Sequence, residues 1–256
     1  MAIFGADSLD PVTIILDGQP IIDQATALYG EKPAFWGRYF KDPASAGVGG
    51  QYDPATEMPV LRAAGIPLLA VARQTNRVGG TSADGAADAQ GNSDAIEAAF
   101  GWNSISTAGN EALVFLDVEI TGSASAAYFT GWSNGLIARS QARSGNKVTL
   151  VPCIYAGPVD NKTWTAVAAS IAAGARCDAV WACRYNNPGT GCHPPPAWDN
   201  TGRLALPAGV NCPVAAWQYD AGCHANAAGA GGFDMSIANP NLANLQSYFL
   251  DRLITP

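Results

Sequence analysis

The sequence is poor in charged residues and has no cluster of basic ones. Lys, Arg, Asp and Glu together make up 14% of its 256 residues, and the formal net charge is −7 at pH 7. Nucleic-acid backbones and anionic lipid surfaces both bind through concentrated cationic side chains. The composition therefore argues against a nucleic acid or a membrane surface as the partner of this chain.

Long apolar runs are also absent. The longest one, residues 165–175, is interrupted by Ser170 and Gly174 and is too short for a hydrocarbon core of about 30 Å. No transmembrane span is expected. The first seven residues lack both the cationic and the apolar region of a signal peptide, so either a signal has been removed or export does not use one.

Low-complexity tracts and internal repeats are missing as well. The 28 glycines and 17 prolines are spread along the chain, and a hydrophobic content of 48% is enough to bury a large core. The length of the chain is that of one α/β barrel. We therefore expect one globular domain over residues 1–256.

Apolar runs rich in β-branched and aromatic residues alternate with segments of helical periodicity over the first two thirds of the chain. The expected strands span residues 12–17, 34–40, 66–72, 112–119 and 147–155. The expected helices lie near 20–29, 54–64, 92–101, 123–143 and 160–174. Such alternation is typical of a parallel sheet.

The last third of the chain has a different pattern. Three further strands are expected at 178–185, 213–219 and 232–237, but Pro, Gly, Asn and Cys replace the helical periodicity between them. Eight strands close a barrel that is packed with side chains. The fold class is therefore expected to be α/β, a single TIM-like (β/α)5(β)3 barrel, with an apolar helical stripe over residues 241–253 covering its outside or bottom.

Two acidic residues end the expected strand at 112–119. This strand is apolar up to Leu116 and then reads Asp117-Val118-Glu119. Because side chains alternate along a strand, both acids point to one face, with Cα atoms roughly 6.6 Å apart. Two such carboxyls can differ in protonation, and glycoside hydrolysis needs one acid to donate a proton and one carboxylate to support positive charge.

Two more acids lie on the strands that a closed barrel makes neighbours. Asp17 ends the expected first strand, and Asp234 lies within the expected last one. Since the reactive groups of a barrel lie at the carboxyl ends of its strands, four carboxylates could converge there. The alternative for Asp17 and Asp234 is turn or cap chemistry, which is common for short acids at strand ends.

Aromatic side chains and arginines also concentrate near the expected strand ends. Flat rings with a polar edge suit stacking on sugars, and guanidinium groups can pair with carboxylates or contact an anionic substrate group. Rings in strands more often belong to a core and arginines more often to structural ion pairs, so only some of these residues should line a groove. The candidate substrate-binding residues are Arg38, Tyr39, Tyr155, Trp181, Trp217 and Tyr219; Arg73 and Arg184 have similar positions.

Together these segments resemble the lysozyme-type glycoside hydrolases of family 25. The sequence is most similar to a related, uncharacterised glycoside-hydrolase-like domain (DUF1906 type), in which a Gly-Arg-Tyr strand like that at 37–39 is typical. The resemblance spans nearly the whole chain, and its most specific parts are the Asp117-Val118-Glu119 strand end and the Trp217-Gln218-Tyr219 strand. It also includes Ile15–Asp17, Phe35–Phe40, Ile154–Ala156 and Phe233–Met235.

The resemblance implies a muramidase. Glu119 would be the proton donor, Asp117 would assist the substrate or the attacking water, and Asp17 and Asp234 would be a supporting pair. The implied substrate is peptidoglycan, cut between N-acetylmuramic acid and N-acetylglucosamine, and no cofactor is implied. The chain departs from the family at Leu16–Gln19, which replaces an Asp-Val-Ser type of opening strand, and in the cysteine-rich segment 185–212.

Six cysteines lie between residues 153 and 223. An even set favours disulfides and an oxidising compartment, with buried free thiols as the alternative for some of them. Neither Cys-His dipeptide (192–193 and 223–224) belongs to a CxxC or HxxxH arrangement, so no metal site is expected. In the implied barrel the expected disulfides are Cys177–Cys212 at the bottom and Cys192–Cys223 at the top, with Cys153 and Cys183 bridged or free.

The sequence thus predicts a secreted or cell-wall-targeted glycosidase that acts on a polysaccharide, with a monomer as the default state. Two alternatives stay open because a fold does not fix a function. One is a barrel without catalytic activity that binds cell-wall or other polysaccharide. The other is a hydrolase of a glycan other than peptidoglycan.

Overall fold

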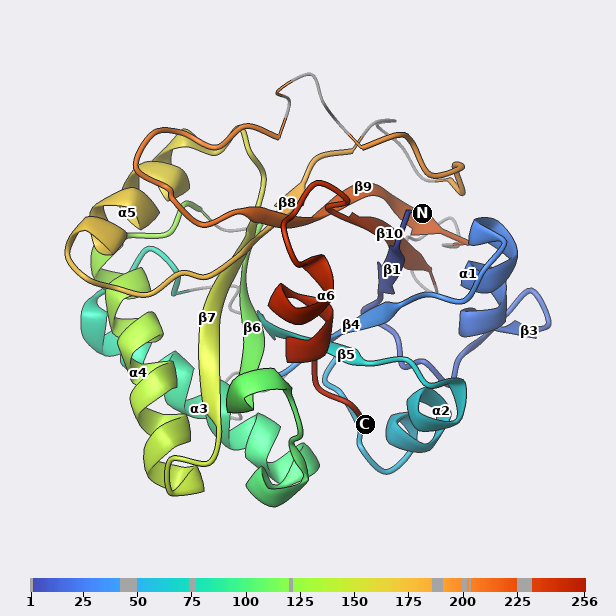
Figure 1. The fold of residues 1–256 in the computed structure, drawn as a ribbon, viewed down its shortest axis with the longest axis horizontal. Coiled ribbons are helices and arrows are strands. Elements are labelled where there is room, and N and C mark those ends of the chain that lie inside the picture. The colour runs from blue at the N-terminus through green and yellow to red at the C-terminus, as the bar shows by residue number, and fades with distance from the viewer. Residues whose placement is uncertain are drawn as a thin grey trace.

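A computed structural model describes residues 2–41, 50–73, 77–119, 122–185, 191–198, 202, 204–224 and 232–256. In this part of the chain, eight strands form a closed barrel in the order β1-β10-β9-β8-β7-β6-β5-β4 (Figure 1). The predicted α/β fold class is confirmed. The barrel strands are β1 (Phe4–Asp7), β4 (Phe35–Tyr39), β5 (Leu68–Arg73), β6 (Glu111–Val118), β7 (Thr149–Ala156), β8 (Val180–Cys183), β9 (Val214–Cys223) and β10 (Phe233–Ala238).

Five helices alternate with the first six barrel strands, as the (β/α)5(β)3 order predicts. They are α1 (Ile21–Tyr29), α2 (Glu57–Ala64), α3 (Ser82–Phe100), α4 (Ala126–Ser144) and α5 (Asn161–Ala172). Neighbouring strands are parallel except at β10, which is antiparallel to both β1 and β9. This follows from its short connection to β9, because a parallel neighbour needs a long crossover. No helix in the described ranges is long and apolar enough to cross a membrane.

The predicted first strand is wrong. The first barrel strand is β1, which ends at Asp7, whereas residues 12–17 lie outside the barrel and contribute only Ile15–Leu16 (β2) to a two-stranded hairpin with Gln19–Pro20 (β3). Asp17 and Gly18 form the turn of this hairpin with φ values of 49° and 81°. An Asp-Gly pair with both residues in the left-handed region is the favoured two-residue hairpin turn. Asp17 therefore has the turn role that was the alternative to a place in the site.

Helix α3 starts ten residues before the predicted boundary at 92, at Ser82. Its first half is rich in Gly, Ala and Asp and lacks an apolar stripe, but Thr81 and Asp84 form a capping box that starts the helix. A Cβ added at Gly85 would lie 2.1 Å from the Tyr128 carbonyl oxygen of α4. The glycine therefore allows α3 and α4 to pack closely.

The barrel interior is filled by alternate side chains of the strands. Leu69, Leu113, Phe115 and Val151 belong to this inner cluster, while a larger outer cluster packs between the barrel wall and the helices. The predicted helix at 241–253 is a four-residue helix, α6 (Leu245–Tyr248), followed by a 3-10 turn.

The C-terminal segment closes the bottom of the barrel, as its apolar stripe predicted. The buried ring of Phe249 lies 5.4 Å from that of Phe35 and 6.3 Å from that of Phe115. Ile254 then exchanges two backbone hydrogen bonds with Leu68. Figure 1 shows α6, in red, across this end of the barrel. The opposite end, at the carboxyl ends of the parallel strands, is called the barrel mouth below.

Candidate active site

The two acids after the apolar part of β6 lie at the barrel mouth. Asp117 has Arg73 of β5 and Tyr155 of β7 as its strand partners, so its side chain faces the barrel axis with theirs. It is buried, whereas Glu119, just beyond the strand, is exposed. Asp117 Oδ1 has no hydrogen-bond partner among the described residues. A buried carboxylate oxygen without a partner is costly, and a ligand or water at the mouth would satisfy it.

Asp7, which no sequence pattern marked as a site residue, ends β1 beside this pair. It is 2% exposed and lies directly opposite Asp234 in the antiparallel β1–β10 ladder. Its side chain occupies the space over Gly37 of β4, where an added Cβ would lie 2.6 Å from the Asp7 Cβ. The glycine of the Gly-Arg-Tyr strand therefore makes room for this carboxylate. The available signal was the acid at the end of the short run Phe4–Ala6, which lacks β-branched residues.

Gln218 of β9 bridges Asp7 and Asp234. Its Nε2 donates to Asp7 Oδ1 at 3.0 Å and to Asp234 Oδ2 at 3.2 Å. Asp234 Oδ1 accepts a further hydrogen bond from the Gly222 backbone N–H at 2.8 Å. Gln218 is 1% exposed, and in the sequence it stands out only as part of the Trp217-Gln218-Tyr219 strand.

The hydroxyl of Tyr155 links this bridge to Glu119. It lies 2.8 Å from Glu119 Oε1 and also contacts Gln218 Oε1. The Tyr155 ring packs against Trp181 with centroids 4.6 Å apart, and Trp181 Nε1 donates to Ser236 Oγ at 3.1 Å. A continuous chain of contacts thus joins Glu119 to the Asp7–Asp234 pair.

Burial and mutual repulsion perturb these carboxyls. The pKa of Asp234 is raised to about 7, mainly by burial and also by the charge of Glu119. The hydrogen bond from the Gly222 backbone N–H opposes this rise. Burial raises the pKa of Asp7, and the charge of Asp234 raises it again. Burial and the charge of Glu119 raise the pKa of Asp117, whereas Arg73 lowers it. The mouth therefore retains protons at a pH where exposed carboxyls are ionised.

Arg73 is the cation nearest to Asp117. Its Nε lies 3.7 Å from Asp117 Oδ2, and its guanidinium carbon lies 5.2 Å from the centroid of the Tyr39 ring. Tyr39 is buried in the inner cluster below. Arg73 and Tyr39 thus form one side of the mouth next to the β6 acids.

Four residues that the sequence suggested for the site do not face the mouth. Trp217 and Tyr219 are each 1% exposed and belong to the outer cluster, because Gln218 between them takes the inward position. Arg38 is fully buried in a bidentate ion pair with Glu57, with Nε–Oε2 at 2.6 Å and an Nη–Oε1 contact at 2.9 Å. Asp17 lies on the hairpin turn with a 75% exposed side chain. Substrate contact through Arg38, Trp217 or Tyr219 is not supported, and neither is Asp17 at the catalytic centre.

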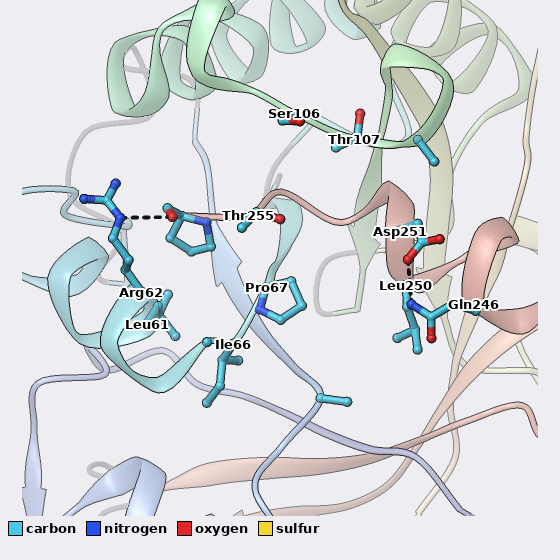
Figure 2. A pocket seen from close by; sticks show the side chains of 14 residues that line it. Leu61, Arg62, Ile66, Pro67, Ser106, Thr107, Gln246, Leu250, Asp251 and Thr255 are labelled. Atoms are coloured by element: carbon cyan, nitrogen blue, oxygen red, sulfur yellow. Dashed lines mark hydrogen bonds between the residues drawn. The ribbon is translucent and has the colours of Figure 1, made fainter.

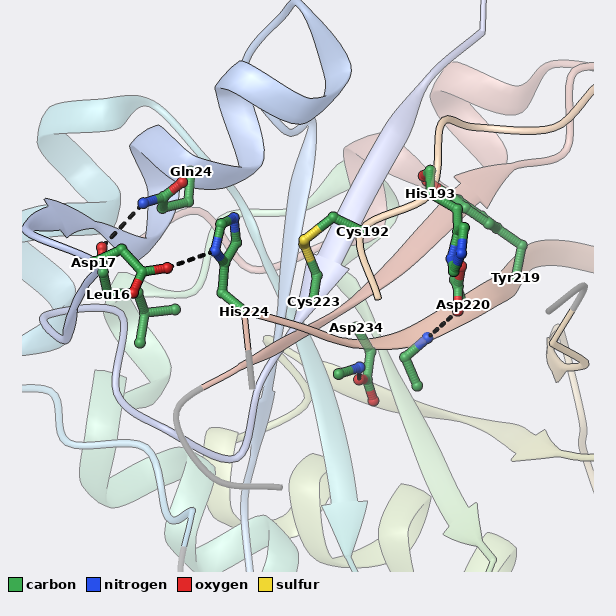
Figure 3. Close-up of a disulfide and its surroundings, with 12 residues drawn as sticks. Leu16, Asp17, Gln24, Cys192, His193, Tyr219, Asp220, Cys223, His224 and Asp234 are labelled. Atoms are coloured by element: carbon green, nitrogen blue, oxygen red, sulfur yellow. Dashed lines mark hydrogen bonds and ion pairs between the residues drawn. A yellow bond between two sulfur atoms is a disulfide. The ribbon is translucent and has the colours of Figure 1, made fainter. Parts of the chain in front are cut away.

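A disulfide ties the end of β9 to the segment that follows β8, above the mouth. The predicted Cys192–Cys223 bond is present and lies between two histidine–carboxylate pairs, His193 with Asp220 and His224 with Asp17 (Figure 3). Since both sulfurs are bonded to each other, they are not free to ligate a metal together with His224, which lies beside them.

The predicted second disulfide is absent. Cys177 and Cys212 are free thiols with sulfurs 3.3 Å apart. Cys153 and Cys183 are also free, which is one of the two states expected for them. The disulfide of the described residues therefore lies at the mouth end of the barrel.

A hollow of about 670 Å³ lies at the opposite end of the barrel (Figure 2). It is lined by the start of β5, the end of α2 and the C-terminal segment, and Arg62 Nε donates to the Pro256 carbonyl oxygen at 3.1 Å beside it. Asp251, an acid that lines this hollow, accepts a hydrogen bond from the Gln246 side chain. Because barrel enzymes react at the carboxyl ends of strands, this end is assigned to stability and the mouth is the candidate active site.

Solved structures with this fold are known. An uncharacterised protein from B. stearothermophilus is 20% identical, with a TM-score of 0.68 over 98% of this chain and 99% of that one. The Clostridium perfringens spore cortex lytic enzyme SleM is 12% identical, with a TM-score of 0.55 over 99% of this chain and 69% of that one. No protein-family model and no curated protein sequence matches the chain. At these identities the likeness concerns the barrel fold alone.

Proposed function

We propose that this protein is a glycoside hydrolase of the muramidase type, which cleaves the glycan strands of peptidoglycan. The observation that carries the proposal is the set of four carboxyls at the barrel mouth: Asp7, Asp117, Glu119 and Asp234. Glycoside hydrolysis uses a pair of carboxyls in different protonation states. Burial and repulsion raise the pKa values of three of these acids, Asp7, Asp117 and Asp234.

Glu119 is the proton donor in this proposal, with Asp117 assisting. Glu119 is exposed and reaches a bound glycan, whereas Asp117 is buried beneath it with an unsatisfied Oδ1. Burial and the charge of Glu119 raise the pKa of Asp117, whereas Arg73 lowers it. Asp117 Oδ1 accepts a hydrogen bond from the substrate or from the attacking water.

Asp7 and Asp234 are the supporting pair, with Asp7 in the role that the sequence suggested for Asp17. Their shared hydrogen bonds to Gln218 keep both carboxyls on the axis of the mouth. The buried Tyr155 and Trp181 rings pack below them and support the floor of the mouth, and the Arg73 guanidinium lies over the Tyr39 ring at its side.

Two observations support the substrate class and the location. SleM, which shares the barrel, is a spore cortex lytic enzyme. The Cys192–Cys223 disulfide favours an oxidising compartment, where a cell-wall glycan is accessible. Both observations agree with a secreted or cell-wall protein.

The test is the release of reducing ends from purified peptidoglycan. Glu119→Gln should lower the rate by about a hundredfold or more, because it removes the general acid, and Asp117→Asn should also lower it strongly. Asp17→Asn is the matched control, since it neutralises an exposed acid outside the mouth, and it should keep full activity. Equal rates for the wild type and Glu119→Gln would refute the assignment.

A binding module would behave differently in the same samples. The wild type would then sediment with peptidoglycan without releasing reducing ends, and Glu119→Gln would sediment equally well. Turnover of chitooligosaccharides or other glycans, with peptidoglycan left intact, would instead indicate a hydrolase with another substrate.

A further inference from the structure

Among the described residues of the mouth, Tyr185 is the aromatic residue that stays open to solvent. It is 39% exposed, and it is the one aromatic residue among the exposed large apolar side chains of the described ranges. The rings below it are nearly closed to solvent, with exposures of 9%, 4% and 1% for Tyr39, Tyr155 and Trp181. A ring offers its face to a ligand only where the ligand reaches it. Tyr185 is therefore the accessible ring of the mouth.

Tyr185 continues the inward-facing side of β8 beyond the end of the strand. Trp181 belongs to the inner cluster, and Cys183 packs against that cluster. The Arg184 backbone N–H donates to the Gln218 carbonyl oxygen at 3.0 Å, so the ladder between β8 and β9 extends past Cys183. Because side chains alternate along an extended chain, Tyr185 lies on the same side as Cys183 and Trp181. It is the uppermost side chain of this inward-facing row.

The hydroxyl of Tyr185 is held inside the mouth. It forms a side-chain hydrogen bond with the Cys183 thiol. Burial and the charges of Cys183, Asp234 and Glu119 raise the pKa of Tyr185, so the hydroxyl keeps its proton and lies near two of the mouth carboxyls. The side chain is thus fixed at its polar end, and a ligand that packs on its ring loses little affinity to ordering it.

We infer that Tyr185 is a sugar-binding residue, on whose ring an uncharged sugar of the substrate stacks beside Glu119. The inference rests on the proposed function, in which Glu119 acts on a glycan. A sugar ring has an apolar face of C–H groups and hydroxyls at its edge. The apolar face packs on the Tyr185 ring, and the hydroxyls donate to the carboxyls of Glu119 and Asp234.

The charges around Tyr185 distinguish the two sugars of peptidoglycan. N-acetylmuramic acid carries a carboxylate, whereas N-acetylglucosamine is uncharged. A carboxylate on the Tyr185 ring would meet the like charges of Glu119 and Asp234, which both act on this side chain. Arg73, the cation beside Asp117, lies on β5, and β6 and β7 separate that strand from β8. The sugar that Tyr185 binds is therefore N-acetylglucosamine.

The experiment measures the binding of a tetramer of N-acetylglucosamine to Glu119→Gln protein by isothermal titration calorimetry. In this parent, Tyr185→Ala should weaken binding about tenfold, because the stacking face is lost. Tyr185→Phe keeps the ring and should weaken binding by less than about threefold, and Tyr185→Trp should bind at least as tightly as the parent. Val159→Ala is the matched control, since it trims an exposed apolar side chain between β7 and α5, and it should leave the affinity unchanged.

Steady-state kinetics on soluble peptidoglycan strands separate a binding role from a structural one. In the protein that retains Glu119, Tyr185→Ala should raise KM about tenfold and leave kcat within about twofold, because stacking holds the substrate and the transition state equally. A fall in kcat at an unchanged KM would mean that Tyr185 supports the acids and not the sugar, and it would overturn the inference.

The calorimetric outcomes are equally decisive. Equal affinities of the parent and Tyr185→Ala would overturn the inference, and so would an equal loss in Tyr185→Phe and Tyr185→Ala, because the effect would then belong to the hydroxyl. A parent that does not bind the oligomer would overturn it as well. The proposed function is decided separately, by the release of reducing ends. A protein that binds the oligomer through Tyr185 and releases none from peptidoglycan would refute that function and keep the inference.

Discussion

Asp234→Asn tests the central electrostatic feature of the mouth, a half-buried acid that stays protonated up to neutral pH. Burial raises the pKa of Asp234 from 3.8 to about 7. An acid whose pKa is higher in the folded protein than in the unfolded chain contributes stability at low pH. This stability is fully present below the pKa of the unfolded state and is lost as the pH rises through the pKa of the folded state. Three pH units at about 1.4 kcal/mol each give a loss on the order of 4 kcal/mol between these limits.

Asparagine carries no charge at any pH and therefore avoids this loss. The free energy of unfolding of Asp234→Asn should equal that of the wild type below pH 4 and exceed it by up to about 4 kcal/mol above neutrality. Urea unfolding followed by circular dichroism at several pH values measures the difference. The same variant should lose glycosidase activity, since stabilising an active site often costs function.

Glu31→Gln is the control for this prediction, because it neutralises an exposed acid that follows α1. It should leave the difference in stability from the wild type the same at every pH tested. If Asp234→Asn were less stable than the wild type above neutrality, or if the difference did not vary with pH, the claim that Asp234 is held protonated by burial would be refuted.

Three further substitutions test the scaffold. Gly37→Ala should destabilise the fold by about 1–3 kcal/mol in urea unfolding and lower activity, because its Cβ would lie 2.6 Å from that of Asp7; wild-type values would contradict the close approach. Cys223→Ser opens the disulfide and should cost about 3 kcal/mol under oxidising conditions, with no difference from the reduced wild type. Glu57→Gln leaves the buried Arg38 cation unpaired and should cost about 3–5 kcal/mol, and a melting temperature equal to the wild type would exclude the ion pair as a structural element.

Much of the barrel was predictable because its signals are local. The runs before Asp117 and Tyr155 are long and apolar, and strands β6 and β7 lie where the sequence predicted them. The Cys192–Cys223 bond was also anticipated, from the top-loop placement that the implied barrel gives both residues. The short β1 was missed, because four residues with a glycine among them give no periodicity to detect, while residues 12–17 have the better strand composition.

The inward faces of the strands could not be derived in the same way. Alternation along β9 shows that Gln218 points opposite to Trp217 and Tyr219, but not which side faces the axis. Ring closure decides this: Gln218 pairs with Ser236 of β10 and Cys183 of β8 on the inner side. The two aromatic residues consequently pack in the outer layer, and the polar residue between them enters the site.

What the sequence determined by itself is the alternation of strands and helices from α1 onward and the pair of acids at the end of β6, because both depend on patterns within a few residues. The tertiary structure alone decided which acids meet. Asp7 and Asp234 are separated by most of the chain and become opposite neighbours only when β10 closes the barrel against β1. Their raised pKa values follow from that closure, because burial and mutual repulsion exist only once the strands are joined.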